Sequence, residues 1–95
     1  VHLDRHAKVR YWIRNVEGKK SSFWLQLPHA KFYPDFVAML TDGRILVVEY
    51  KGQHLYEAEA VKRRIGAVWA DSSNGQCLFC MPTNRDFGLI DRTIG

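Results

Sequence analysis

The chain has 95 residues, of which 46% are apolar and 13% aromatic, and this composition fits one domain folded around a single core. The length excludes several domains, the aromatic content excludes disorder, and no apolar run approaches the roughly 18 residues of a membrane-spanning helix. The net charge is +4, but residues 1–31 hold seven basic and two acidic side chains (net +5), against seven basic and eight acidic (net −1) in residues 32–95. A basic segment of this kind suits a polyanion, although a solvated surface carries the same excess in many small domains.

Two alternating segments open the chain. In residues 8–15, Val9, Tyr11 and Ile13 alternate with Lys8, Arg10, Trp12 and Arg14, which is the period of a half-buried strand. Residues 23–27 alternate in the same way, and Glu17-Gly18-Lys19-Lys20 lies between the two segments like a turn. We therefore expect these segments to pair as a hairpin with a basic outer face, and with Trp12 and Trp24 as neighbours on one face.

A second hairpin is expected from about Tyr33 to Gly52, with near-continuous apolar arms at residues 36–40 and 45–48 that indicate burial on both faces. An amphipathic helix follows, because apolar residues recur at three- and four-residue steps from Leu55 to Trp69, with Glu57, Glu59, Arg63 and Arg64 between them. Residues 71–75 end this helix, and residues 76–81 form a buried strand. Together these elements predict an α/β fold with a mixed β-sheet.

Two features near the C-terminus are less informative. Cys77 and Cys80 have no second cysteine pair to complete a zinc site, and we interpret them as reduced thiols in a buried strand. The tail from Asn84 to Gly95 predicts at most one short helix, around residues 87–90.

The informative acids are Asp35 and Glu49, on opposite arms of the second hairpin. A two-residue turn would set Asp35 opposite Tyr50, whereas a three-residue loop, Thr41-Asp42-Gly43 with Gly43 left-handed, sets Asp35 opposite Glu49. We expect the second register, or another in which the numbers of paired residues have an even sum. Directly opposed carboxylates, about 4.5–5.5 Å apart at Cβ, repel each other, and a divalent cation would offset that cost. Mg²⁺ prefers such oxygen ligands and shares them with phosphate oxygens, and Lys51 lies on the same face as Glu49 if the strand continues.

These residues resemble the PD-(D/E)xK nuclease superfamily, whose core is an α-β-β-β-α-β unit. A wider set of motifs resembles the endonuclease domain at the C-terminal end of type III restriction enzyme Res subunits: Trp12-Ile13-Arg14-Asn15, Phe32-Tyr33-Pro34-Asp35-Phe36, Asp42-Gly43-Arg44, Val48-Glu49-Tyr50-Lys51-Gly52 and Lys62. The resemblance covers about residues 7–82. One departure is that the family commonly carries an acid on a helix before the first strand, where this sequence has only Asp4, so we expect that helix to be truncated.

The resemblance implies an Mg²⁺-dependent deoxyribonuclease, with Mn²⁺ as a substitute, acting on double-stranded DNA. Asp35 and Glu49 would bind the metal together with the Tyr50 carbonyl, Lys51 would be the catalytic lysine and Gln53 an accessory catalytic group. The candidate DNA contacts are Lys8, Arg10, Arg14 and Lys62.

We expect residues 1–95 to form one nuclease-like domain of a larger, cytoplasmic helicase-nuclease protein. No Gly-x-x-x-x-Gly-Lys-[Ser/Thr] loop occurs, so ATP would bind only a motor domain outside this chain. The expected partners are that helicase/ATPase domain and a modification (methyltransferase) subunit, without a membrane. Two alternatives remain open: a catalytically silent nuclease fold that binds nucleic acid, and another repair or junction nuclease of the same superfamily.

Overall fold

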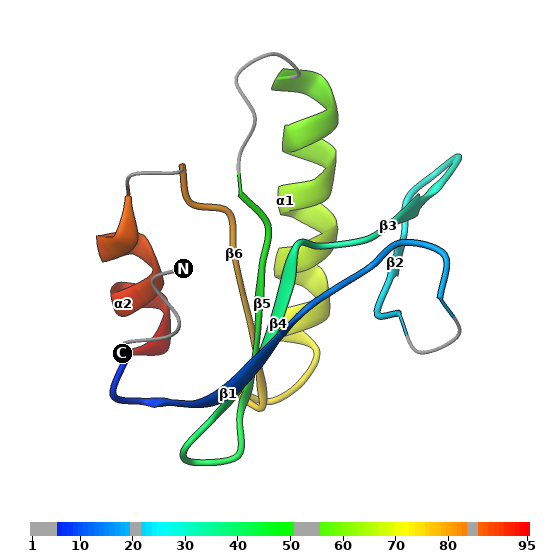
Figure 1. Ribbon diagram of the computed structural model, residues 1–95. Coiled ribbons are helices and arrows are strands. Elements are labelled where there is room, and N and C mark those ends of the chain that lie inside the picture. The colour runs from blue at the N-terminus through cyan, green and yellow to red at the C-terminus, as the bar shows by residue number, and fades with distance from the viewer. Residues whose placement is uncertain (1–5, 20–21, 51–55, 84–85) are drawn as a thin grey trace.

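The computed structural model describes residues 6–19, 22–50, 56–83 and 86–95. Four strands form the main sheet, two short strands form a second sheet, and two helices complete the described fold (Figure 1). The elements are β1 Val9–Arg14, β2 Leu25–Gln26, β3 Lys31–Phe32, β4 Phe36–Leu40, β5 Ile45–Val48, α1 Tyr56–Asp71, β6 Cys77–Cys80 and α2 Phe87–Ile94.

The main sheet is mixed, as the sequence predicts. Its order is β1-β4-β5-β6, with antiparallel pairing of β1 with β4 and of β4 with β5, and parallel pairing of β5 with β6. A parallel pair needs a crossover connection, and α1 lies within the one between β5 and β6. The α/β class and the mixed sheet are therefore confirmed.

The register of the β4–β5 hairpin is also confirmed. Phe36 pairs with Val48 and Met39 with Ile45, so Thr41, Asp42 and Gly43 form a three-residue loop. Gly43 takes the left-handed conformation expected of it, with a φ of 89°. The Asp42 carboxylate accepts a hydrogen bond from the Arg44 amide at 3.1 Å, which closes the turn.

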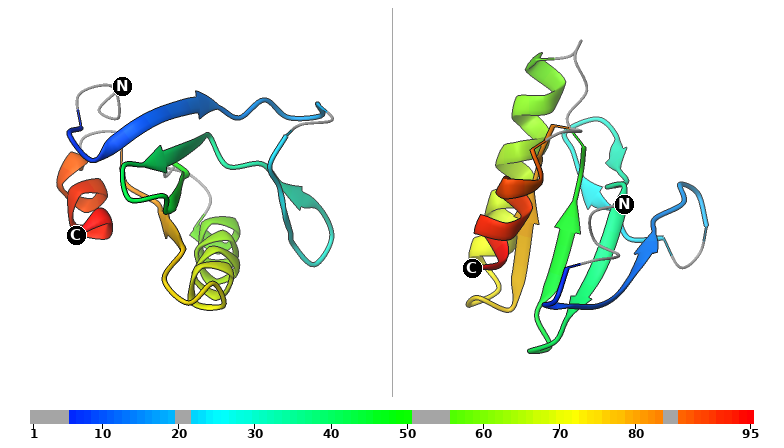
Figure 2. Two further views of the ribbon diagram at one scale, coloured as in Figure 1. Left: turned by 90° about the horizontal axis from the view of Figure 1, so that it is seen from below. Right: turned by 60° about the vertical axis from the view of Figure 1, so that its left-hand side comes forward.

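The two helices cover opposite faces of the sheet (Figure 2). On one face Ile90 and Ile94 of α2 join a buried cluster whose other members are Ala38, Leu40, Leu46, Val48 and Cys80. On the other face α1 packs closely on β6, because a Cβ on Gly66 would lie only 2.3 Å from the Phe79 ring. α2 is longer than the helix expected at residues 87–90, and the Asp86 carboxylate caps its N-terminus by accepting a hydrogen bond from the Leu89 amide.

The predicted pairing of the first two segments is wrong. β1 pairs with β4, and β2 pairs instead with β3 in the separate small sheet. Consequently Trp12 packs edge-on against Phe36 with ring centroids 5.3 Å apart, whereas Trp24 is exposed beneath the Lys31 ammonium. The hairpin prediction failed because it considered only adjacent segments, whereas β4 offers β1 an apolar partner strand.

The predicted faces of β1 are also wrong. Tyr11 and Ile13 were expected on the buried face of a half-buried strand, but both are 55% exposed, while Trp12 is half-buried. The cause is an irregularity in the β1–β4 register between Val9 and Tyr11. One inserted residue moves every later side chain to the opposite face of a strand.

Candidate metal-binding acidic site

Asp35 and Glu49 lie at one end of the sheet, directly before β4 and directly after β5. Their main chains are tied to the outer strands. The Glu49 amide donates to the Cys80 carbonyl at 3.0 Å, and the Asp35 carbonyl accepts from the Asn15 amide at 2.8 Å. These two backbone hydrogen bonds fix Asp35 relative to β1 and Glu49 relative to β6.

The two carboxylates are bound reciprocally by the opposite arm of the hairpin. Glu49 Oε1 accepts a hydrogen bond from the Asp35 amide at 3.1 Å, and Asp35 Oδ2 accepts one from the Tyr50 amide at 2.8 Å. Such bonds hold an acid in one orientation and compensate part of the repulsion between two facing carboxylates. The expected juxtaposition of Asp35 and Glu49 is therefore confirmed.

Lys62 of α1 reaches into this pair. Its ammonium lies 3.1 Å from Glu49 Oε2 and 3.8 Å from Glu59 Oε1, and 5.1 Å from the centre of the Phe32 ring. Lys62 was expected as a DNA contact, and the structure places it against the candidate metal ligand Glu49. The contact also shows that the Glu49 side chain points to the α1 face of the sheet.

The electrostatics of Glu49 are unusual for a glutamate. Its pKa is raised from 4.5 to about 7, first by burial and then by the negative charge of Asp35, while Lys62 opposes the shift. The residue is only 7% exposed, so water contributes little to the solvation of its charge. A buried acid next to a second acid is an arrangement that favours cation binding.

Glu59 is an acid of this site that the sequence analysis missed. It was counted among the polar positions of the helix, yet it is only 6% exposed, whereas Val68 of the predicted apolar stripe is 59% exposed. The stripe of α1 that faces the sheet contains Glu59, Lys62 and Gly66. Because these residues are not apolar, apolar periodicity does not reveal this stripe. The available signal was the three-residue spacing of an acid and a lysine on one helix.

The other predicted DNA contacts lie apart from the acids. Lys8 lies at the opposite end of the sheet, where its carbonyl binds the Thr41 amide and its ammonium contacts the Gly95 carbonyl. Arg14 pairs with Phe36 and by strand alternation shares its face, which is opposite to that of Asp35. Arg10 is exposed at the register irregularity. All three side chains are exposed, and their contact with DNA stays a prediction.

Three further predicted site residues can be placed only in part. Lys51 and Gln53 lie outside the described residues. Tyr50 follows Glu49, and its ring packs against Phe36 with centroids 5.8 Å apart. The ring packs against the buried cluster that α2 shares with the sheet, and this burial raises the pKa of the Tyr50 hydroxyl. Metal binding by the Tyr50 carbonyl stays a prediction.

The donor set fits a hard divalent cation with two protein ligands. Among the described residues there is no group of three or more His, Cys, Asp or Glu side chains that could hold a metal ion. Mg²⁺ needs no such group, because it usually binds one or two carboxylates and keeps water or phosphate oxygens in its other positions. Asp35 and Glu49 are two carboxylates that the backbone already holds together, so they suit that requirement.

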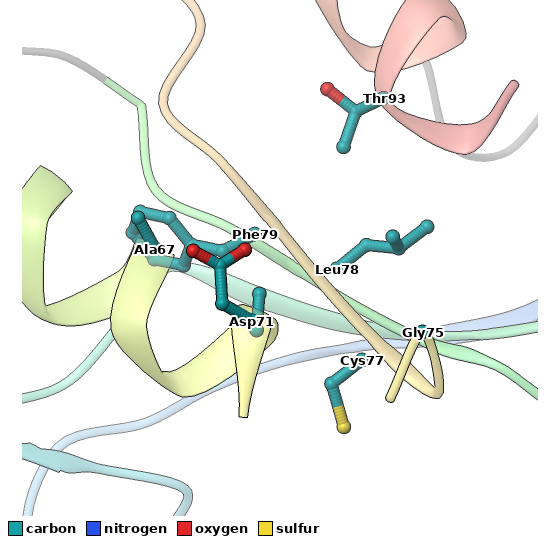
Figure 3. Close-up of a pocket in the computed structure, with 8 residues that line it drawn as sticks. Ala67, Asp71, Gly75, Cys77, Leu78, Phe79 and Thr93 are labelled. Carbon is teal, nitrogen blue, oxygen red and sulfur yellow. The ribbon is translucent and has the colours of Figure 1, made fainter. Parts of the chain in front are cut away.

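A separate open pocket of about 400 Å³ lies between α1, β6 and α2 (Figure 3). Ala67 and Asp71 line it from α1, Cys77 and Phe79 from β6, and Thr93 from α2. Of the described residues that line it, Asp71 alone is acidic, and none of the acids near Lys62 contributes. The pocket therefore lacks the paired carboxylates on which the metal hypothesis depends.

No protein-family model matches the chain, and neither a curated protein nor a solved structure matches it. Within the residues that the structure describes, neither helix has the length and apolar character needed to cross a membrane.

Proposed function

We propose that this chain is an Mg²⁺-dependent nuclease domain of the PD-(D/E)xK type that hydrolyses phosphodiester bonds in double-stranded DNA. The observation that carries the proposal is the reciprocal hydrogen bonding of Asp35 and Glu49 across the hairpin. Opposed acids at a sheet end are costly without a cation, and the pKa of Glu49 is raised to about 7, first by burial and then by the negative charge of Asp35. A bound divalent cation would compensate that cost.

Each residue of the site has a distinct task under this proposal. Asp35 and Glu49 would hold Mg²⁺, with the Tyr50 carbonyl as a further ligand. When bound, Mg²⁺ supplies electrostatic stabilisation of charge that develops on the phosphate, and a more acidic water. Lys51 would act on the same water or phosphate, with Gln53 as an accessory group.

The architecture supports the proposal at the level of topology. The order β1, β4, β5, α1, β6 is compatible with the strand and helix sequence of an α-β-β-β-α-β core, and both acids lie on its central hairpin. The same proposal includes a parent protein with a helicase motor, of the Res-subunit type and partnered by a methyltransferase, and a cytoplasmic location. These parts of the proposal rest on the sequence motifs.

A silent nucleic-acid-binding fold is the second candidate, and one observation favours it. Both oxygens of Glu49 already have partners, the Asp35 amide and the Lys62 ammonium, so the described acids are satisfied in part without a metal. A module of this kind would bind nucleic acid through its basic residues and ignore divalent cations.

Calorimetric titration of Mg²⁺ and Mn²⁺ separates these candidates. Glu49→Gln and Asp35→Asn each remove one ligand charge and are expected to weaken binding at least about tenfold. Asp71→Asn removes an equivalent charge from an exposed site and should bind like the wild type. Equal binding by all four proteins would place the metal elsewhere, and no binding by any would favour the silent fold.

Cleavage is best measured in the parent protein by nicking of supercoiled DNA. Lys51→Ala is expected to abolish nicking while metal affinity is largely kept, because a lysine is not a metal ligand. If the Asp35, Glu49 and Lys51 variants all cut like the wild type, the nuclease assignment is wrong.

A further inference from the structure

Lys62 lies between two buried acids that come from different elements. Glu49 follows β5, Glu59 is one turn before Lys62 on α1, and the ammonium is 3.1 Å from the first and 3.8 Å from the second. The shorter distance is a hydrogen bond and the longer one is not. Lys62 is therefore hydrogen-bonded to Glu49 and lies near Glu59 without a hydrogen bond to the Oε1 atom of that residue.

Glu59 is left incompletely satisfied by this arrangement. Its Oε2 atom is buried, and within the described part of the chain it has no hydrogen-bond partner. Burying a carboxylate oxygen without a partner is unfavourable, and such an atom in a folded protein calls for a physical reason. One reason is a state of the protein in which Glu59 does have a partner.

We propose that Lys62 is a built-in counter-ion of the acidic site, which neutralises Glu49 in the metal-free protein and moves to Glu59 when a divalent cation binds. The inference rests on the proposed metal site and adds its regulation. It makes Glu59 the acceptor for a displaced lysine and makes Lys62 a competitor of the metal.

The charges of the site balance in this scheme. Among the described residues of the site, Asp35, Glu49 and Glu59 carry three negative charges when ionised and Lys62 carries one positive charge, so one divalent cation brings their sum to zero. A buried site that is neutral with its ligand avoids the cost of an uncompensated charge. Without the cation these four described residues retain an excess of negative charge, in keeping with the unsatisfied Glu59 oxygen.

The movement required of Lys62 is small. Glu59 and Lys62 are three residues apart on one helix, which places their side chains on the same face. A lysine has a flexible four-carbon stem, so rotation about its side-chain bonds can bring the ammonium, which lies 3.8 Å from Glu59 Oε1, to Oε2 of the same carboxylate, which has no partner among the described residues, without moving the helix. The direction of the movement is away from Glu49, and it exposes Oε2 of that carboxylate to an incoming cation.

The test is Mg²⁺ titration of four proteins by calorimetry: the wild type, Lys62→Met, Glu59→Gln and the double variant. Measurement at about pH 8.5 keeps Glu49 ionised in each, so that proton binding does not mask the effect of Lys62. Methionine retains the length of the lysine stem without its charge. Arg64→Met is the matched control, since it removes a positive charge from an exposed position of the same helix, and near-ultraviolet circular dichroism checks that each variant folds.

Lys62→Met is expected to bind Mg²⁺ about tenfold more tightly than the wild type, and Arg64→Met to bind within about twofold of it, because a charge at contact distance outweighs a distant solvated one. In the Glu59→Gln background Lys62 has lost its alternative partner, so it competes more strongly with Mg²⁺ for the Glu49 carboxylate. The tightening caused by Lys62→Met should therefore be at least about threefold larger there than with Glu59 present.

The outcomes distinguish a failure of the counter-ion inference from a failure of the proposed metal site. If the wild type binds Mg²⁺ and Lys62→Met binds it equally or more weakly, the role of Lys62 as a counter-ion is overturned, while the metal site stands. A tightening of the same size in both backgrounds overturns Glu59 as the acceptor. Absence of binding in the wild type and in every variant refutes the metal site and the inference with it, whereas binding that appears only without Lys62 supports both.

Discussion

Asp35 and Glu49 bind each other's strand: the amide of Asp35 donates to Glu49 Oε1 at 3.1 Å, while Asp35 Oδ2 accepts from the amide of Tyr50, the residue after Glu49. Each acid thereby depends on the position of the other arm of the hairpin. Any cation at this point would be held by groups that the sheet has already oriented, and pre-orientation lowers the entropic cost of binding.

The first prediction concerns stability and pH in the absence of metal. The Glu49 pKa is about 7 in the folded protein, above the ordinary value of 4.5, so between these values the folded state binds a proton that the unfolded state has lost. The free energy of unfolding should therefore fall as pH rises through this window, by up to about 3 kcal/mol for Glu49 alone. Urea denaturation in EDTA at several pH values measures the fall.

The control for this prediction is Glu49→Gln, which has no group to ionise at that position. As pH rises, its free energy of unfolding should fall less than that of the wild type, because the contribution of Glu49 is absent. Asp71→Asn, an exposed acid at the end of α1, should decline like the wild type. A parallel profile for Glu49→Gln and the wild type would show that Glu49 ionises normally.

The second prediction concerns metal affinity and pH. Protons and a cation compete for the same carboxylate, so Mg²⁺ should bind more tightly as pH rises and reach a plateau above about pH 7. Below that point the dissociation constant should change by up to about tenfold per pH unit. Calorimetry in two buffers of different ionisation enthalpy would detect the released proton. Affinity that is the same at pH 5.5 and pH 8 would contradict Glu49 as a ligand with a raised pKa.

The third prediction concerns Asn15, whose side chain connects three segments near the acids. Its Nδ2 atom donates to the carbonyls of Phe23 and Pro34 at 2.7 and 2.9 Å, and its Oδ1 atom accepts from the Phe23 amide at 2.9 Å. Asn15→Ala removes all three bonds and leaves partly buried backbone groups unpaired. The expected loss is about 2 kcal/mol in the free energy of unfolding, together with weaker metal binding because Asp35 follows Pro34 directly.

Gln26→Ala is the control for Asn15. Its side chain also binds backbone carbonyls, at Leu27 and Ala30, but it does so at an exposed position. Its loss should cost no more than about 0.5 kcal/mol. Equal effects of the two substitutions would mean that Asn15 has no special part in fixing the acids.

The sequence predicted the acidic pair because its register depends on local geometry. The three residues Thr41, Asp42 and Gly43 form the loop, and Gly43 tolerates the left-handed conformation that the loop requires. Once that loop is assigned, the pairing of Asp35 with Glu49 follows by counting along two short arms.

Partners distant in sequence were not predictable in the same way. β1 pairs with β4 across more than twenty residues, and its irregularity near Arg10 has no signature in the alternation of the strand. Glu59 was missed for a related reason: its burial depends on how closely α1 approaches β6. That approach is set by tertiary packing, which apolar periodicity along one helix does not reveal.

The last prediction tests this approach of α1 to β6 at Gly66. A Cβ built there would lie 2.3 Å from two carbons of the Phe79 ring, so Gly66→Ala forces the helix or the ring to move, although alanine favours a helix. We expect a net loss of about 2 kcal/mol in the free energy of unfolding, as for other overpacked contacts. Gly88→Ala in α2 is the matched control, because the nearest atom to its Cβ would be the flexible end of Arg92 at 3.0 Å, with Asp86 Oδ1 at an ordinary contact distance of 3.6 Å, and it should be neutral or stabilising. Phe79→Leu replaces the ring with a smaller side chain. In that background Gly66→Ala should therefore lower the free energy of unfolding by less than it does in the wild type. If Gly66→Ala instead stabilises the protein as Gly88→Ala does, α1 lies farther from β6, and the contact of Lys62 with Glu49 would have to be reconsidered.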